Sequence, residues 1–318
     1  MLRVGFAAVR VLVLVNPAAS SVTAPARAAL ERTLRAALHV EVSETTRRGH
    51  ATEIARRAAA DGFDVVAVFA GDGTLNEAAN GLAGTTTVLA PLPGGSTNVF
   101  ARTLGVAFDP LDAAKQLVDS LATRSFRRVG LGAAAAPGQE RRRFLFHLGL
   151  GFDAAVIRRM EQRSYLKRHF AHPAFALAAV DTWARHYDRR SAIRLESIGP
   201  DGIETATGPY AVISNSDPYT YVGHRRMSIA AGASLSRPLA VTVLRSLGAG
   251  LIVRATSSAV GSGAFMASAP DITQITDVTS VEVSGDRPFP WQVDGDYLGE
   301  IGRVEVLYEP DTLTLVVP

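Results

Sequence analysis

Short apolar runs alternate with stretches of helical spacing over the first third of the chain. The pattern predicts strands at residues 11–15, 40–43, 65–69 and 87–90, and helices at 22–38, 51–61, 74–82, 97–104 and 110–121. In the first helix, Leu30, Leu34 and Leu38 fall on one face. Strands that alternate with helices are typical of a mostly parallel sheet with helices on both faces. We therefore predict an α/β three-layer, Rossmann-like domain over residues 1–124.

The pattern changes near residue 124, after which β-branched and alternating apolar residues dominate. The predicted strands are 126–134, 143–150, 191–198, 209–214, 238–245, 281–285 and 303–308. A helical insert at about 153–187 interrupts them, and residues 133–143 are typical of a hairpin loop. We predict a mainly antiparallel β-sandwich domain over residues 125–318. Its last apolar strand, Leu313–Val317, could pair with either domain.

Composition bounds the class of protein. The chain has 318 residues, of which 47% are hydrophobic, enough for two domains with real cores. The absence of cysteine excludes disulfides and cysteine-ligated zinc, and it fits a reducing compartment. A net charge of +3 is too small to indicate a nucleic-acid partner. Because no run approaches the ~20 apolar residues of a membrane helix, we expect a soluble or peripherally bound protein.

Candidate chemistry begins directly after the predicted strand 65–69. There the chain enters Gly71-Asp72-Gly73-Thr74 and continues at once into a helix. Glycines let the backbone turn sharply and approach a ligand closely. A helix start offers unpaired N–H groups and a positive dipole end, which suit a phosphate. The alternative is a tight turn in which Thr74 is the helix N-cap.

A second junction of the same kind follows the next predicted strand. Gly94 and Gly95 precede Ser96, Thr97 and a predicted helix. Because ligands bind beyond the carboxyl ends of parallel strands, both turns should lie along one edge of the sheet. We expect them to hold one ligand from two sides, although Ser96 or Thr97 could simply be a helix cap.

These motifs, in this order, resemble the diacylglycerol kinase catalytic-domain family, which includes bacterial lipid kinases and the sphingosine and ceramide kinases. The resemblance rests on VNP (15–17), TTRRGHA (45–51), AGDGTLNEAANGL (70–82), PGGSTNVFAR (93–102), GLGFDAAV (149–156) and WQVDGD (291–296). The last two segments resemble second-domain motifs, so the resemblance spans nearly the whole chain. It implies ATP and Mg²⁺ as cofactors, and transfer of the γ-phosphoryl group to a lipid hydroxyl.

The resemblance also implies a nucleotide site. Its residues would be Asn16, Thr45, Gly71, Gly73, Thr74, Asn76, Glu77, Gly94, Gly95 and Ser96. Ser96 stands where the family usually has a threonine that contacts phosphate. Asp72 or Glu77 would help to hold Mg²⁺. Arg237 occupies the segment that often carries a structural magnesium in bacterial members, so we expect no such metal here.

A distal acidic turn supplies the candidate base. Asp294-Gly295-Asp296 stands where the family commonly has Asp-Gly-Glu, whose glutamate is thought to be the base. Asp296 is therefore the candidate acceptor of the substrate hydroxyl proton, with Asp72 and Asp294 as further catalytic acids and Glu300 as a fallback. The alternative is a hairpin turn, for which Asp-Gly is a strong signal. Since Asp296 lies far along the chain from Asp72, we expect the active site in a cleft between the domains.

The helical insert carries a candidate membrane surface. Its basic residues are Arg158, Arg159, Arg163, Lys167 and Arg168, with aromatic residues between them. Such a face either contacts anionic lipid headgroups or is simply solvated. We expect a cytoplasmic protein bound peripherally to the inner face of the membrane. An exposed edge strand of the sandwich could also pair across a two-fold axis in a homodimer.

Three hypotheses for function stay open. The first is an ATP-dependent lipid kinase that uses a diacylglycerol-like or sphingoid acceptor. The second is a soluble kinase of the NAD kinase type, which shares a Gly-Gly-Asp-Gly loop. The third is a lipid- or nucleotide-binding relative without turnover, because Val99, Asp296 and Arg237 depart from the family pattern. A long apolar acceptor pocket would favour the lipid, and a polar pocket would favour the dinucleotide.

Overall fold

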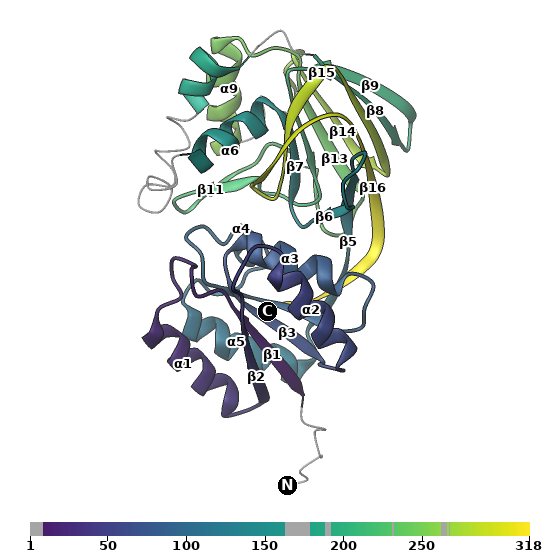
Figure 1. Cartoon of the computed structure of the whole chain (residues 1–318). Helices are drawn as coiled ribbons and strands as arrows, with labels where there is room; N and C mark the ends of the chain where they lie inside the picture. Colours follow the sequence, from purple (N-terminus) through teal and green to yellow (C-terminus); the bar gives the residue numbers. More distant parts are fainter. Residues whose placement is uncertain (1–8, 163–178, 188–191, 231, 262–265, 267) are drawn as a thin grey trace. The chain divides into compact units, whose positions relative to one another are not determined.

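The structure is a computed structural model that describes residues 9–318 except 163–178, 188–191, 231, 262–265 and 267 (Figure 1). The chain forms two compact units. Unit 1 comprises residues 1–129 and 311–318, and unit 2 comprises residues 130–310. The division therefore falls five residues beyond the position where the sequence pattern changes, inside a strand that continues from one unit into the other. None of the described helices is long and apolar enough to cross a membrane.

Unit 1 is built on a parallel sheet in the order β2-β1-β3-β4. Its elements are β1 (Arg10–Val15), α1 (Ala24–Arg35), β2 (His39–Glu44), α2 (His50–Ala60), β3 (Val65–Ala70), α3 (Asp72–Leu82), β4 (Val88–Pro93), α4 (Val99–Thr103) and α5 (Pro110–Thr123). Every residue of β3 and β4 is buried, as expected for central strands covered on both faces. The end of the chain adds a strand beside β4, where Leu315 pairs in parallel with Leu89.

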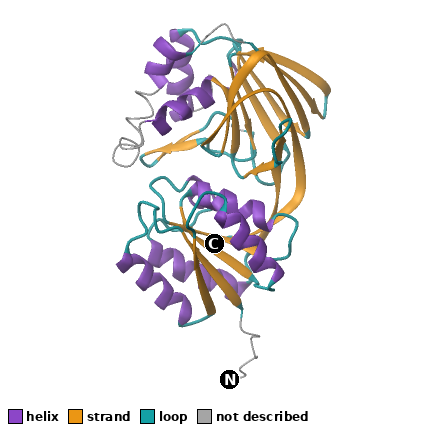
Figure 2. Cartoon of the chain, in the orientation of Figure 1, coloured by secondary structure: helices purple, strands orange, loops and turns teal. Residues whose placement is uncertain are grey.

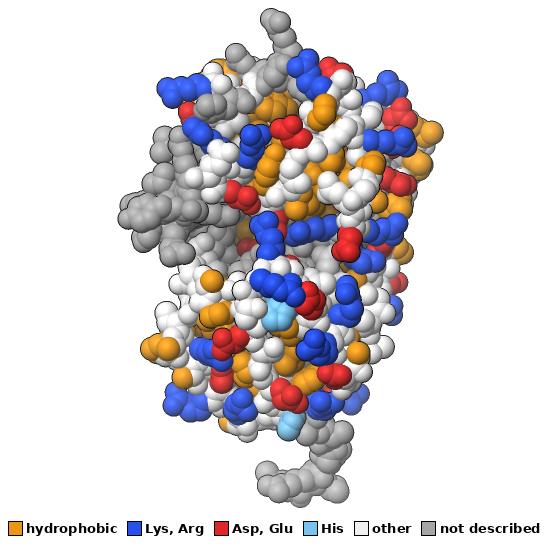
Figure 3. Space-filling view, viewed as in Figure 1, with side chains coloured by type: hydrophobic (Ala, Val, Ile, Leu, Met, Phe, Trp, Pro, Cys, Tyr) orange, Lys and Arg blue, Asp and Glu red, His pale blue; other side chains and the backbone are white. Residues whose placement is uncertain are grey.

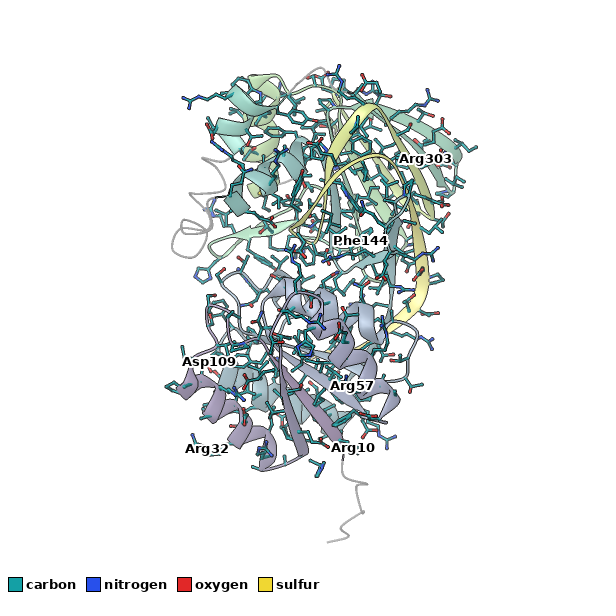
Figure 4. The ribbon with its side chains drawn as sticks, viewed as in Figure 1. Arg10, Arg32, Arg57, Asp109, Phe144 and Arg303 are labelled. Carbon is teal, nitrogen blue, oxygen red and sulfur yellow. The ribbon has the colours of Figure 1, made fainter. Side chains whose placement is uncertain are left out.

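Helices cover both faces of this sheet. Figure 1 shows α1 and α5 on one face, with α2 and α3 on the other. Caps in the sequence set where the helices begin. Asp109, labelled in Figure 4, accepts hydrogen bonds from the backbone N–H groups of Leu111 (2.9 Å) and Asp112 (3.1 Å) at the start of α5. Gly81 lets α2 and α3 pack closely, because a Cβ there would lie 2.5 Å from the Thr52 carbonyl oxygen.

Unit 2 is mainly antiparallel. The strands that lie wholly or mostly in unit 2 are β5 (Phe126–Ala135), β6 (Arg142–Phe144), β7 (His147–Gly151), β8 (Ile193–Gly199), β9 (Gly202–Gly208), β10 (Tyr210–Ser214), β11 (Thr220–Val222), β12 (Arg225–Met227), β13 (Leu239–Leu244), β14 (Ile272–Val278), β15 (Ser280–Val293) and β16 (Asp296–Val316), whose last residues pair with β4 of unit 1. The first half of β15 pairs with β8 and the second half with β7. Two register shifts against β16 allow this long strand to bend between the two layers.

The core of unit 2 lies between these layers. Trp291, Phe289 and Phe144 are almost completely buried in one cluster that draws on ten strands, and Figure 4 labels Phe144. The helices α6 (Phe152–Gln162) and α9 (Ala249–Val260), with the π-helical turn η1 (Thr182–His186), gather on one side of the strands (Figure 2). They form two further apolar clusters against that side. On the face seen in Figure 3, basic and acidic side chains are interspersed.

The predicted fold class is confirmed: an α/β domain precedes an antiparallel β-rich domain. Some elements differ from the prediction. The predicted strand 143–150 is interrupted between β6 and β7, while α9, β9 and β14 were not predicted. The terminal strand pairs with the first domain. Of the predicted helical insert, residues 163–178 lie outside the described residues, and with them Arg163, Lys167 and Arg168.

Candidate functional site

The loops of unit 1 that follow β1, β2, β3 and β4 meet at one edge of the sheet, because parallel strands end together. Backbone hydrogen bonds join them directly. The Gly94 N–H donates to the Ala70 carbonyl oxygen (2.9 Å), and the Ser21 N–H donates to the Gly94 carbonyl oxygen (2.9 Å). The Ser21 hydroxyl donates to the Gly95 carbonyl oxygen (3.2 Å). The loops after β1, β3 and β4 therefore form one connected surface.

The two glycine turns found in the sequence are in direct contact. A Cβ on Gly95 would lie 2.8 Å from the Gly71 Cα, and a Cβ on Gly94 would lie 2.8 Å from the Ala70 nitrogen. Only glycine tolerates such an approach of backbone to backbone. The structure thus brings together the turns that the sequence placed separately after β3 and β4.

Replacing Gly94 by alanine is expected to lower the free energy of unfolding by about 2–3 kcal/mol, because the added methyl group meets fixed backbone rather than a movable side chain. Gly73→Ala is the matched control, since nothing lies within 4 Å of a Cβ there. That variant should be as stable as the wild type. Urea unfolding followed by circular dichroism measures both, and equal midpoints for the two variants would contradict the prediction.

Asp72 ties one glycine turn to the next. Its Oδ2 accepts a hydrogen bond from the Val99 N–H (2.9 Å) and its Oδ1 accepts one from the Phe100 N–H (3.1 Å), at the start of α4. Burial raises the pKa of Asp72, and these two N–H groups act in the opposite direction. Asn98, which precedes α4, bonds through its side chain to both the N–H and the carbonyl oxygen of Gly95. In this structure, Asp72 therefore fixes the position of the loop after β4 relative to the loop after β3.

Glu77 does the same for the loop after β2. Its two carboxylate oxygens accept hydrogen bonds from the Gly49 N–H (2.9 Å) and the Ala51 N–H (3.2 Å), at the start of α2. The neighbouring Asn76 is fully buried, and its carbonyl oxygen accepts a hydrogen bond from the Asn80 side chain. Thr45, at the end of β2, is buried and continues the pairing with β1.

Asn16 and Thr74 are also in contact, with the Asn16 amide donating to the Thr74 hydroxyl (2.9 Å). Thr74 lies inside α3, whose N-cap is Gly71, so the alternative of Thr74 as N-cap is wrong. Ser96 is exposed, and α4 begins after Asn98 rather than after Ser96 or Thr97.

This arrangement leaves the start of α3 available for a ligand. Gly71 provides no side-chain cap, and the N–H groups of the first turn, which includes Gly73 and Thr74, have no intrahelical acceptor. The space next to Gly73 is open. A helix N-terminus with open space before it suits an anionic group such as a phosphate. Thus the donors present fit the phosphates of a nucleotide.

The fit to a metal ion is poorer. Both carboxylates predicted to hold Mg²⁺, Asp72 and Glu77, already accept hydrogen bonds from backbone N–H groups on each oxygen. Among the described residues, no group of three or more His, Cys, Asp or Glu side chains could hold a metal ion. The assignment of magnesium to these two residues stays a prediction.

In unit 2, the predicted acidic turn is a tight hairpin. Val293 pairs with Asp296, and the two residues between them, Asp294 and Gly295, have φ angles of 48° and 83°. Positive φ at both central residues is the geometry that Asp-Gly favours in a two-residue hairpin. The Asp294 carboxylate is buried and accepts three backbone N–H bonds, from Leu145 (2.7 Å), Phe146 (3.0 Å) and His147 (2.9 Å). It therefore holds the break between β6 and β7.

Asp296 has different surroundings. Its carboxylate forms an ion pair with Arg142 (2.7 Å), and the side chains of the pair are only 19% and 24% exposed, respectively. The fallback residue Glu300 pairs with Arg158 (3.2 Å) at half-exposed positions. Asp296 is thus the more ordered and more enclosed of the two candidate bases.

An apolar pocket of about 110 Å³ lies in unit 2. It is lined by Phe152, Asp153, Val156, Ala179, Tyr210, Tyr219, Met227, Ile229, Leu244, Leu247, Ile252, Ala255, Thr256, Ala259 and Met266. Sequence reasoning missed this pocket, since its walls come from several distant segments. The one signal available was GLGFDAAV, in which an aspartate comes two residues after the end of a buried strand.

A buried polar cluster lies at this pocket. Asp153 accepts hydrogen bonds from the Tyr219 hydroxyl on Oδ1 (2.7 Å) and from the Gln292 amide on Oδ2 (2.8 Å). Burial raises the pKa of Asp153 to about 6, although both hydrogen bonds lower it. His147 stacks on Tyr219 with ring centroids 4.3 Å apart, and burial lowers the pKa of His147 to about 3. The bond between Asp153 and Gln292 joins the two second-domain motifs of the sequence.

Comparison with known proteins finds the family that the sequence motifs resemble. Residues 10–127 match the family model of the diacylglycerol kinase catalytic domain. Diacylglycerol kinase from Bacillus subtilis (strain 168) is 38% identical over 96 residues, which are 29% of this chain and 32% of that protein. Diacylglycerol kinase from Staphylococcus haemolyticus (strain JCSC1435) is 35% identical over 92 residues, 28% of each chain. The matched segments thus span less than a third of either curated relative.

Solved structures show the same fold over the whole chain. The crystal structure of a diacylglycerol kinase from Bacillus anthracis str. Sterne has a TM-score of 0.68 at 20% identity and covers 99% of this chain and 98% of its own. Another crystal structure from that strain has a TM-score of 0.74 at 21% identity, with 99% of both chains covered. Residues 10–127 therefore match the diacylglycerol kinase catalytic domain, and the resemblance seen in the sequence is confirmed for that segment.

Proposed function

We propose that this chain is an ATP-dependent lipid kinase that transfers the γ-phosphoryl group to a lipid hydroxyl. The observation that carries the proposal is the contact between the two glycine turns at the uncapped start of α3. Both turns lie within the segment that matches the diacylglycerol kinase catalytic domain.

In this proposal the start of α3 binds the phosphates of the nucleotide. Phosphoryl transfer depends mainly on positioning and on neutralising charged oxygens, and backbone N–H groups can serve both needs. ATP supplies the phosphoryl group when bound. Asn16 and Thr74 are held together beside this helix start, and the exposed Ser96 adds a hydroxyl from the second turn. Asp72 and Glu77 contribute indirectly, because their carboxylates fix the loops around this helix start.

The pocket of unit 2 supports a lipid acceptor. Its lining is almost entirely aliphatic and aromatic, and no arginine or lysine is among the lining residues that the structure describes. A dinucleotide carries phosphates and ribose hydroxyls, which need cations and polar partners. The pocket therefore favours the lipid acceptor over the NAD kinase alternative.

Asp296 is proposed as the base. Its carboxylate would accept the proton of the acceptor hydroxyl as that oxygen attacks the phosphoryl group. Arg142 holds the carboxylate in place through the 2.7 Å ion pair. Arg142 would then be a positioning residue for the carboxylate of Asp296.

Exposed aliphatic residues near the pocket support action at a membrane surface. Val180 and Val253 are 64% and 65% exposed, and each follows a residue that lines the pocket. Two exposed arginines accompany them: Arg185 lies in η1, five residues after Val180, and Arg254 follows Val253 in α9. Exposed aliphatic side chains accompanied by arginines are typical of surfaces that contact anionic lipids. We propose that the acceptor is taken up from such a surface.

The test is transfer of label from γ-labelled ATP, with Mg²⁺, to diacylglycerol, a sphingoid base or a glycerophospholipid presented in anionic vesicles. Label should appear in lipid. Asp296→Asn is expected to lower the rate at least ~100-fold, while the exposed control Glu300→Gln changes it by less than about twofold. Gly73→Ala should fold normally yet raise the KM for ATP, since its methyl group enters the proposed phosphate space.

Three outcomes would oppose the proposal. A folded protein that labels none of these acceptors is not a lipid kinase of this type. Transfer to NAD in place of lipid would support the soluble-kinase alternative. Binding of ATP and lipid without any phosphoryl transfer, in both the wild type and Asp72→Asn, would support a lipid- or nucleotide-binding relative without turnover.

A further inference from the structure

The pocket of unit 2 contains a carboxylate without a positive partner. Asp153 is 4% exposed, and its two hydrogen-bond donors, Tyr219 and Gln292, are both neutral. No Lys, Arg or His side chain in the part of the chain that the structure describes bonds to it. The nearby His147 ring is itself kept neutral by burial, which lowers its pKa to about 3. A buried carboxylate that lacks a positive partner is costly, even when neutral donors bond to it.

A second polar group in the same pocket also has unused capacity. Tyr210 lines the pocket, and its hydroxyl makes no hydrogen bond with any described residue. Burial and the charge of Asp153 raise the pKa of Tyr210 well above its usual value, so the hydroxyl stays protonated. The pocket thus offers one group that only accepts hydrogen bonds and one that both donates and accepts.

The polar end of the pocket is connected to the turn that carries Asp296. Gln292 donates to Asp153 through Nε2 and accepts from the Gly295 N–H through Oε1 (2.8 Å). Gly149 makes room for this connection, because a Cβ there would lie 1.7 Å from Asp153 Oδ2. A group bound at Asp153 is therefore two hydrogen bonds from the hairpin of the proposed base.

We infer that Asp153 selects the polar end of the acceptor. In this inference the pocket binds an amphiphile whose aliphatic chain contacts the apolar wall and whose head group donates hydrogen bonds to Asp153. An ammonium head is preferred to a hydroxyl head, and a carboxylate head is rejected. The inference deepens the proposed function and rests on it for the identity of this pocket as the acceptor site.

Charge explains the expected order. An ammonium group supplies the missing positive partner and has three donors, enough to reach Asp153 and Tyr210 together. Hydrogen bonds between charged groups are about twice as strong as neutral ones. A hydroxyl has a single donor and no charge. A carboxylate would place a second negative charge beside Asp153 in an apolar site.

Binding to the full chain at pH 7.5 tests the inference without ATP. Isothermal titration compares dodecylammonium, dodecanol and dodecanoate, with the two ions below their micelle concentrations and the alcohol below its solubility limit. The amine should bind at least ~10-fold tighter than the alcohol, and dodecanoate at least ~10-fold more weakly. Asp153→Asn should bring all three within about threefold. The control Asp201→Asn, in the exposed turn between β8 and β9, removes the same charge and should leave the order unchanged.

A pH series provides a second readout should Asp153→Asn fail to fold. The preference for amine over alcohol should fall in the wild type as the pH drops from 7.5 to 5, through the pKa of Asp153 of about 6. The groups around Asp153 are Tyr210, Tyr219, Gln292 and His147, and none of them changes charge in that range.

Two results would overturn the inference: equal binding of the three head groups by the wild type, or an unchanged order in Asp153→Asn. Phosphoryl transfer is measured separately. A protein that phosphorylates lipid without any preference among head groups would refute the role of Asp153 and leave the proposed function standing.

Discussion

Replacing Asp294 by alanine is expected to lower the free energy of unfolding by about 4 kcal/mol. The substitution strands three backbone N–H groups, those of Leu145, Phe146 and His147, in a site where the carboxylate is almost fully buried. Each buried donor left without an acceptor costs about 1–3 kcal/mol. Urea unfolding monitored by tryptophan fluorescence is the appropriate measurement, because Trp291 lies in the core of the same unit.

Two further variants sharpen this prediction. Asp294→Asn keeps one acceptor oxygen and should lose less stability than the alanine variant. Asp286→Ala removes a carboxylate from an exposed position of the same strand, β15, and should change stability by less than about 0.5 kcal/mol. An Asp294→Ala protein that unfolds at the wild-type urea midpoint would show that these three hydrogen bonds do not stabilise the fold.

The same experiment separates two roles for Asp294. A residue that acts only in catalysis would lose activity at full stability. If Asp294 acts by shaping the loop before β7, activity and stability should fall together, and low temperature should restore part of both. The catalytic assignment from sequence stays a prediction until that comparison is made.

Asp153 and His147 are expected to change the stability of unit 2 with pH in opposite directions. Burial lowers the pKa of His147 from 6.5 to about 3, so the unfolded chain takes up that proton first and stability is lost as the pH falls from about 6.5. Burial raises the pKa of Asp153 from 3.8 to about 6, so its contribution is greatest below about pH 4 and is lost as the pH rises through 6.

In the wild type these two effects nearly cancel between pH 4 and 6. Removing one should expose the other, with a slope of at most about 1.4 kcal/mol per pH unit. Asp153→Asn should lose stability relative to the wild type as the pH falls through that range. His147→Phe, which keeps an aromatic ring to stack on Tyr219, should gain stability relative to the wild type over the same range.

Urea unfolding of the three proteins at half-unit steps from pH 4 to 7 measures the two slopes. Subtracting the wild-type curve removes the contribution of the surface carboxylates, which all three proteins share. Parallel curves for the wild type and both variants would show that neither group has the shifted pKa on which this prediction depends.

Much of unit 1 could be predicted from the sequence because its signals are local. Apolar runs such as Val65–Ala70 bury both faces of a strand, and parallel strands necessarily end at the same edge. The glycine turns at Gly71 and Gly94–Gly95 therefore had to lie near one another. The Asp-Gly hairpin at Asp294 is equally local, since its two positive φ angles follow from residue type.

Helix α9 shows where local signals fail. Its segment, AGLIVRATSSAV, is flanked by a glycine at each end. It also contains several β-branched residues, which have low helix propensity. It forms a helix whose Ala255 and Ala259 pack into an apolar cluster with Tyr219 and Leu244. Burial of that face outweighs the propensity, and burial depends on residues far away in the chain.

The sequence by itself determined the order of strands and helices in unit 1, the position of the glycine turns and the resemblance of residues 10–127 to the diacylglycerol kinase catalytic domain, because these depend on spacing and residue type. Only the tertiary structure decided what each acid contacts. Asp72 and Glu77 bond to backbone N–H groups of neighbouring loops, and Asp153 meets Gln292, 139 positions away. A carboxylate acts through the donors that surround it, and in a folded chain those donors come from segments that no local pattern connects.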